Sequence, residues 1–79
     1  MKYKVGDLVI DKGVMQEVYK GDIGKVVEVY GNGITIKWIY MKNPLQGEDY
    51  LGAKNAYDNQ QVDSFFKIIS KEKAMVEML

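Results

Sequence analysis

The residue types present in this chain limit the chemistry that it can perform. The sequence has no histidine and no cysteine, and all eleven of its basic residues are lysines. Histidine is the commonest general base and metal ligand, cysteine supplies thiolates, and arginine binds phosphates and carboxylates through two hydrogen bonds. Carboxylates, lysines and tyrosines are the remaining acid–base groups. We therefore expect a protein that is not an enzyme and that uses no cofactor or metal.

Two glycine-containing stretches resemble parts of phosphate-binding motifs but do not complete them. Residues 21–25 read Gly-Asp-Ile-Gly-Lys, yet a Walker A loop needs glycine and Ser or Thr where this chain has Tyr19 and Val26. The same stretch matches the GxxG loop of KH domains, but that loop joins two helices, and strand-like sequence follows here. Residues 31–33, Gly-Asn-Gly, lack the third glycine of a dinucleotide fingerprint. Both stretches are predicted to form turns.

The carboxylates form no recognisable catalytic pair. Glu48 and Asp49 are adjacent, so on a strand their side chains would point to opposite faces. Asp7, Asp22 and Asp63 each precede apolar, strand-like residues, where an aspartate side chain commonly bonds turn amides. The spacing of an EF-hand calcium loop is also missing.

Aromatic residues are more informative, because six tyrosines and one tryptophan exceed what the turns require. Trp38 and some tyrosines are expected in the core of a small domain. Residues 42–61 show no sustained helical or strand period, and long loops of this kind tend to be functional or mobile. Tyrosine is also enriched at protein interfaces. We predict that the segment supplies a binding site; the alternative is that it packs across the domain. The candidate residues are Tyr40, Asp49, Tyr50, Lys54, Asn55 and Tyr57.

Charge is balanced over the whole chain, with eleven lysines, eleven acidic residues and a formal net charge of zero. Nucleic-acid-binding domains usually carry a basic excess, and a DNA mimic would need an acidic one. A local stripe formed by Lys20, Lys25 and Lys37 on the outside of the fold is the nucleic-acid alternative. The competing interpretation is a solvated surface of mixed charge.

Glycine turns divide the chain into short strand-like segments. Residues 7–12 contain the short apolar run Leu8-Val9-Ile10, residues 25–30 are rich in valine, and residues 31–33 between two strand-like segments predict a hairpin turn. In residues 34–41 the side chains alternate, which predicts a strand. Its core face is expected to carry Ile34, Ile36, Trp38 and Tyr40.

The last third of the chain is expected to complete the same domain, because 79 residues support a single core. Residues 62–69 have strand composition and are predicted to close a barrel. Ser70 is predicted to cap a short helical tail over 70–79, with Ala74, Met75, Met78 and Leu79 along one side. This apolar tail would pack on its own barrel or on a second subunit of a homodimer.

Two stretches resemble SH3-like barrel domains. They are residues 4–10, Lys-Val-Gly-Asp-Leu-Val-Ile, and residues 20–29, which are similar to the KOW motif of ribosomal and transcription-elongation proteins. Residues 32–38 look like the strand that follows, and residues 65–68 match the closing strand loosely. The resemblance implies a mainly β fold, a small SH3-like β-barrel that binds RNA or protein without a cofactor. Residues 42–61 would then be a long inserted loop.

The functional hypotheses are of three classes. We expect a binding module for another protein; the alternatives are a KOW-like RNA- or DNA-binding module and an oligomer that sequesters a small ligand. The abundance of lysine, isoleucine, asparagine and tyrosine, with no arginine, indicates an AT-rich genome, as in a low-GC bacterium or a bacteriophage. In a bacteriophage the protein partner would be a host factor.

The longest apolar runs are too short to span a bilayer, so we expect a cytoplasmic protein with no membrane partner.

Overall fold

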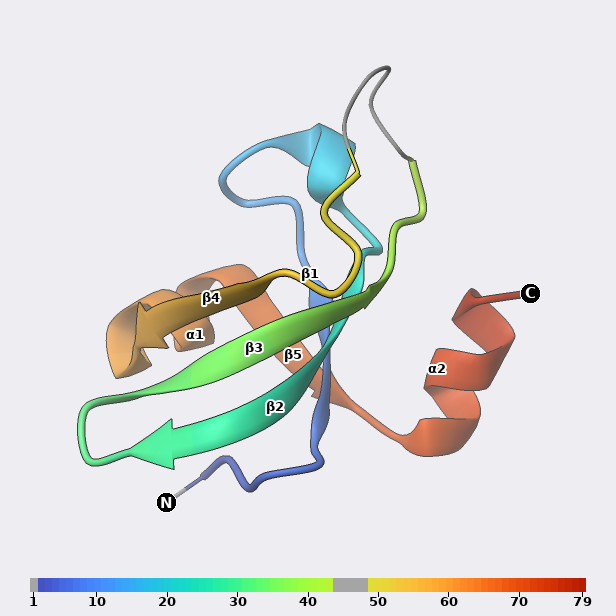
Figure 1. The fold of residues 1–79 in the computed structure, drawn as a ribbon. Coiled ribbons are helices and arrows are strands. Elements are labelled where there is room, and N and C mark those ends of the chain that lie inside the picture. Colours follow the sequence, from blue (N-terminus) through green and yellow to red (C-terminus); the bar gives the residue numbers. More distant parts are fainter. Residues whose placement is uncertain (1, 44–48) are drawn as a thin grey trace.

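A curled five-stranded antiparallel sheet, a half-barrel, carries the fold (Figure 1). The structure is a computed structural model that describes residues 2–43 and 49–79. Its elements are β1 (Leu8–Asp11), the 3-10 turn η1 (Glu17–Tyr19), β2 (Ile23–Tyr30), β3 (Gly33–Tyr40), β4 (Lys54–Asp58), α1 (Asn59–Phe65), β5 (Phe66–Ile69) and α2 (Lys71–Glu77). The strands lie in the order β4-β3-β2-β1-β5. The predicted mainly β class with a short C-terminal helix is confirmed.

The sheet separates two apolar clusters, one on each face. Val9 belongs to the larger cluster, whereas its neighbours Leu8 and Ile10 belong to the other, because successive side chains of a strand point to opposite faces. We call the face of Val9 the inner face and that of Leu8 the outer face. The inner core contains Tyr3, Val9, Val26, Ile34, Ile36, Trp38, Val62 and Phe66. The outer cluster contains Ile23, Ile69 and Ala74, with Leu8, Ile10, Tyr40 and Met78 packed against it.

The β2–β3 hairpin turns where the sequence predicted, since Tyr30 pairs with Gly33 across the turn residues Gly31 and Asn32. Neither turn residue has a positive φ angle, so the turn does not need glycine for that reason. Gly33 is required by a close approach instead. A β carbon there would overlap the carbonyl oxygen of Tyr57 in β4 and lie 3.0 Å from the Cα of Asp58. At Gly31 a β carbon would meet nothing within 4 Å.

The expectation of a loop over residues 42–61 is wrong for its second half. Lys54–Asp58 forms β4, which pairs with β3 from Gly33 opposite Asp58 to Lys37 opposite Lys54. Asp58 then begins α1 with a capping box: its side chain accepts from the backbone N–H of Gln61, and the Gln61 side chain accepts from the N–H of Asp58. Both residues were visible in the sequence as a helix-start signal. Residues 44–48 lie outside the described residues.

The strand predicted over residues 62–69 is also shorter than expected. Residues up to Phe65 belong to α1, and Phe66–Ile69 forms β5. β5 pairs with β1, with Leu8 opposite Ile69, so β4 and β5 are the two edges of the sheet and are not paired with each other.

The C-terminal helix begins at the predicted residue, because Ser70 Oγ accepts a hydrogen bond from the backbone N–H of Lys73 at 3.1 Å. Ala74 is fully buried and Met78 packs on the outer cluster, as expected. Met75 and Leu79 are not part of that contact: they are 58% and 100% exposed. Of the helices that the described residues form, none is long and apolar enough to cross a membrane.

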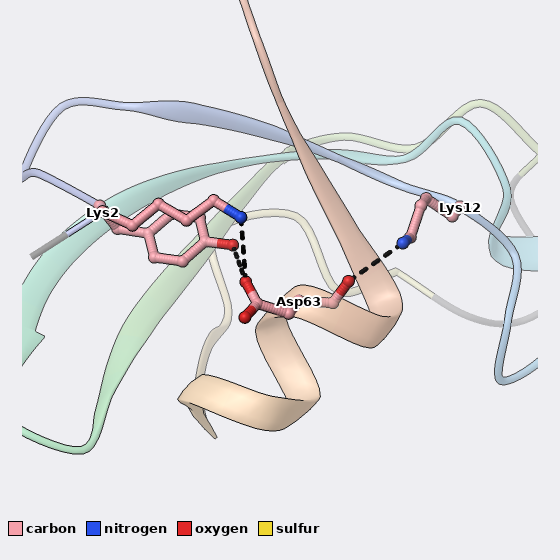
Figure 2. Close-up of polar contacts among 4 residues, drawn as sticks. Lys2, Lys12 and Asp63 are labelled. Atoms are coloured by element: carbon pink, nitrogen blue, oxygen red, sulfur yellow. Dashed lines mark hydrogen bonds and ion pairs between the residues drawn. The ribbon is translucent and has the colours of Figure 1, made fainter.

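Asp63 in α1 anchors the start of the chain to the inner core (Figure 2). Its Oδ1 accepts a hydrogen bond from Tyr3 OH at 2.8 Å and one from Lys2 Nζ at 3.2 Å, and Lys12 Nζ donates to its backbone carbonyl at 3.0 Å. The hydrogen bonds from Tyr3 and Lys2 lower the pKa of Asp63. Burial, reinforced by the bond to Asp63, raises the pKa of Tyr3 to about 12.

Replacing Gly33 with alanine should destabilise the sheet, because the added methyl group would force β3 and β4 apart. We expect G33A to lower the free energy of unfolding by about 1–3 kcal/mol, the usual cost of overpacking. The matched control G31A adds the same group in open space and should stay within about 0.5 kcal/mol of the wild type. Urea unfolding monitored by Trp38 fluorescence measures both, and equal effects of the two variants would refute the close approach.

Alkaline pH should selectively remove the contribution of Tyr3. Its pKa is about 12 in the folded chain and about 10 when unfolded, so the native state keeps a proton that the unfolded state loses. The contribution is complete below the unfolded pKa and is lost as the pH rises toward 12. The difference in unfolding free energy between the wild type and Tyr3→Phe should therefore narrow over this interval. Urea titrations of both proteins at successive pH values measure it, and a constant difference would contradict the proposed proton linkage.

Candidate binding cleft

A cleft of about 280 Å³ opens between the β1–β2 loop (residues 12–22) and the segment that leads into β4. Figure 1 shows these two segments side by side above the sheet, with η1 in the loop. The cleft is lined by Asp11, Met15, Tyr19, Asp22, Trp38, Tyr50, Asn55 and Tyr57.

The aromatic wall of the cleft is continuous with the inner core. The Tyr50 ring meets Tyr19 and Trp38 edge to face, each with centroids 6.1 Å apart. Trp38 and Tyr57 both contact the buried Phe66, at centroid distances of 5.7 and 4.9 Å. Edge-to-face geometry is favourable for aromatic pairs. The wall is therefore held by packing that the fold itself needs.

Two nearly buried carboxylates face this wall. Asp22, 1% exposed, accepts from the backbone N–H of Lys42 at 2.9 Å through Oδ1 and from the hydroxyl of Tyr50 through Oδ2. Asp11, 5% exposed, accepts from the N–H of Gly13 at 2.7 Å through Oδ1. Burial raises the pKa of Asp11, against the effect of the Gly13 hydrogen bond, and the charge of Asp22 raises it further. Burial and the hydrogen bond to Asp22 raise the pKa of Tyr50.

The charge of these carboxylates is not balanced by a nearby cation. Within residues 2–43 and 49–79, the side-chain ion pairs join Lys2 to Asp63 and Lys42 to Glu77, and neither involves Asp11 or Asp22. The same residues contain no cluster of three or more acidic side chains that could hold a metal ion. Two carboxylates among aromatic rings suit an organic cation, which gains from both the charges and the ring faces.

Three of the six residues predicted for a binding site line the cleft together: Tyr50, Asn55 and Tyr57. Asn55 has a positioning role, since its Oδ1 accepts from Trp38 Nε1 at 3.1 Å. Asp49 is exposed and bonds the N–H of Leu51 at 3.1 Å, which is a local turn contact.

Tyr40 and Lys54 lie on the outer face. In β2 and β3, Gly24 pairs with Trp38 but Ile23 pairs with Tyr40, so one residue of β3 is extra at this point. Such a bulge reverses the alternation of side chains. Tyr40 therefore packs against the outer cluster instead of following Trp38 to the inner face. Lys54 pairs with Lys37 and shares its face.

Five cleft residues were not among those predicted for the site: Asp11, Met15, Tyr19, Asp22 and Trp38, of which Trp38 was predicted for the core. The backbone N–H of Asp11 donates to the carbonyl of Asp22 at 2.8 Å, and the pair closes the base of the β1–β2 loop. Ile10 pairs with Ile23 immediately below. Pairing the apolar residues of β1 with those of β2, so that Ile10 lies opposite Ile23, would have placed the two carboxylates opposite each other. That pairing was the signal in the sequence from which they could have been found.

The predicted stripe of lysines takes a different form in the structure. Lys25 pairs directly with Lys37, and Lys37 pairs with Lys54. Because Lys25 also pairs with Leu8, all three lie on the outer face. We call Lys25, Lys37 and Lys54 the lysine row. Lys20 is exposed on the β1–β2 loop and is not part of it.

No protein-family model, no curated protein and no solved structure matches this chain.

The two carboxylates should respond differently to replacement by asparagine. Asp22→Asn weakens one of two hydrogen bonds made by a buried side chain and should lower the free energy of unfolding by about 1–3 kcal/mol. Asp11→Asn can keep the Gly13 bond while removing a buried charge, so stability at pH 7 should be unchanged or higher. Because the folded pKa of Asp11 is raised, any gain should shrink as acid protonates the wild type. Thermal unfolding at neutral and acid pH measures both; a clearly less stable D11N protein would show that the fold needs this charge.

Proposed function

We propose that this protein is a non-catalytic binding module that recognises a protein partner by taking a cationic side chain, lysine or arginine, into the cleft. The observation that carries the proposal is the placement of Asp11 and Asp22. Both are nearly buried, and in the described part of the chain neither has a cationic partner. A buried carboxylate without a counter-charge is unfavourable, and the incoming cation supplies that charge.

The aromatic wall adds to the attraction of the carboxylates. A cation close to the face of tryptophan or tyrosine is attracted by the ring electrons, by about 0.5–2 kcal/mol depending on how far it is desolvated. Tyr19 and Tyr50 are only partly buried, so their rings are accessible from the mouth of the cleft. The hydrogen bond from Tyr50 to Asp22 orients both groups before the ligand arrives.

The size of the cleft favours a side chain over a larger ligand. Its volume, about 280 Å³, falls just below the roughly 300–1,000 Å³ typical of sites for drug-sized molecules. One lysine or arginine side chain fits such a space, whereas a ligand as large as a dinucleotide does not. In the alternative function, an oligomer that sequesters a small ligand, the ligand bound in this cleft would be a small free cation.

The proposed architecture is an SH3-like barrel, and nucleic-acid binding is the second candidate function. The curled sheet supports an SH3-like barrel, and in the KOW-like segment Gly24 lies where a β carbon would overlap Ile36, beside the Trp38 ring. This gives Gly24 a packing role. Nucleic-acid binding has the neighbouring Lys25 and Lys37 in its favour. A bacteriophage origin with a host protein as partner remains a prediction from composition.

Binding of blocked tripeptides to the protein tests the proposal. The peptides Gly-Xaa-Gly carry lysine, trimethyl-lysine, arginine or, as the neutral control, glutamine at the centre, and the single Trp38 reports binding by fluorescence. We expect the three cationic peptides to bind and the glutamine peptide not to bind. D11N should abolish binding while remaining folded.

The matched control is Glu28→Gln, which removes one exposed negative charge from the outer face of β2. Since it lies outside the cleft, binding should be unchanged. Equal binding of cationic and neutral peptides, or equal loss in D11N and E28Q, would refute recognition of a cation in the cleft.

A further inference from the structure

The edge of the sheet at β4 has backbone groups that face outward. β4 is the last strand in the sheet order, and its residues are exposed except for the half-buried Tyr57. The N–H of Trp38 donates to the carbonyl of Ala53 at 3.0 Å. Because the antiparallel ladder alternates, Asn55 and Tyr57 direct their backbone groups to β3, whereas Lys54 and Ala56 direct theirs to the open edge.

The two sides of this edge differ sharply in charge. On the inner side, Asn55 and Tyr57 form one wall of the acidic, aromatic cleft. On the outer side, Lys54 is the end of the lysine row. An added strand would lie about 4.8 Å beyond β4, with successive side chains on opposite faces. Successive side chains of that strand would therefore lie alternately against the acidic cleft on the inner side and against lysine on the outer side.

We propose that an extended segment of the protein partner pairs with the open edge of β4 as a sixth strand, with a lysine or arginine on the inner side entering the cleft and acidic residues on the outer side meeting Lys54 and Lys37. The inner contact rests on the function proposed above, and the outer one does not. Addition of a strand to an exposed sheet edge uses backbone hydrogen bonds for affinity and side-chain pockets for specificity. The recognised sequence is thus acidic–basic–acidic within an extended segment.

The lysine row supports an acidic occupant. Like charges directly opposite on neighbouring strands destabilise a sheet, and here three lysines are in register. No carboxylate of the described residues forms an ion pair with them. Acidic side chains of a bound strand relieve this repulsion. A lysine at an edge also discourages unspecific pairing, so the row selects among strands as well as attracting one.

A pair of heptapeptides provides the test. The first, Thr-Val-Glu-Lys-Glu-Val-Thr, places lysine on one face and glutamates on the other; the second has the same composition, with the lysine and the first glutamate exchanged. We expect the first to bind about tenfold more tightly than the second and than the lysine tripeptide. In amide hydrogen exchange followed by NMR, the N–H groups of Lys54 and Ala56 should become protected when the first peptide binds.

Charge reversal at the edge separates the outer contact from general electrostatics. Lys54→Glu should weaken binding of the first heptapeptide about three- to tenfold and leave the lysine tripeptide unaffected. The matched control is Lys67→Glu, an exposed lysine of β5 at the other edge of the sheet, which should change neither.

The outcomes distinguish this inference from the proposed function. If the tripeptides bind but the heptapeptide is no tighter and the β4 amides stay unprotected, edge pairing is refuted and recognition in the cleft stands. If the heptapeptide protects the N–H groups of Lys54 and Ala56 equally in the wild type and in D11N, edge pairing is supported and the contact of the peptide lysine with the cleft is refuted. A third outcome is that oligouridylate binds, that K54E weakens its binding and that the heptapeptide does not compete with it. The lysine row would then bind phosphates, and the inference is overturned.

Discussion

The buried carboxylate of Asp22 is the contact on which the geometry of the cleft depends. It bonds the backbone of Lys42 just after β3 and the hydroxyl of Tyr50 in the segment before β4, while its own backbone closes the β1–β2 loop on Asp11. Three segments far apart in sequence thus share one anionic group. Their convergence forms a concave surface from parts that have little regular structure of their own. The same arrangement brings Asp11 close to Asp22, and the two carboxylates together make the cleft acidic.

The sheet packs against an apolar cluster on each of its two faces. The inner core fills the curl of the half-barrel, and α2 covers the outer face over β1 and β5. Ile23 of β2 and Tyr40 of β3 belong to the outer cluster, but the outer face around Lys25, Lys37 and Lys54 is left open, because no further helix of the described residues covers it. Lysines occupy this open area, which keeps it hydrated and leaves three charges in line. The outer face is thus packed against α2 at one end of the sheet and open at the other. Because β4 lies at the open end, its outer side carries lysine while its inner side lines the acidic cleft.

Local signals in the sequence predicted the hairpin turn, the strand after it and the cap of α2, since each depends on residues close together in the chain. The same signals failed where pairing between distant strands decides. Nothing near Tyr40 indicates the bulge that turns it to the outer face, and Asp11 and Asp22 meet only through the register of β1 with β2. β4 was missed because Asn55 and Asp58 disfavour strands. The capping box of Asp58 and Gln61 was a readable local signal that was overlooked.

Asp58 is both the last residue of β4 and the N-cap of α1. A strand with no loop before its helix cannot slide along its neighbour without breaking the cap, and a slip by one residue would exchange the two faces of the strand. The helix is in turn tied through Asp63 to Tyr3 and the inner core. The cap therefore acts as a stop that fixes which side chains of β4 face the cleft, in a strand whose five residues would otherwise define their register only weakly.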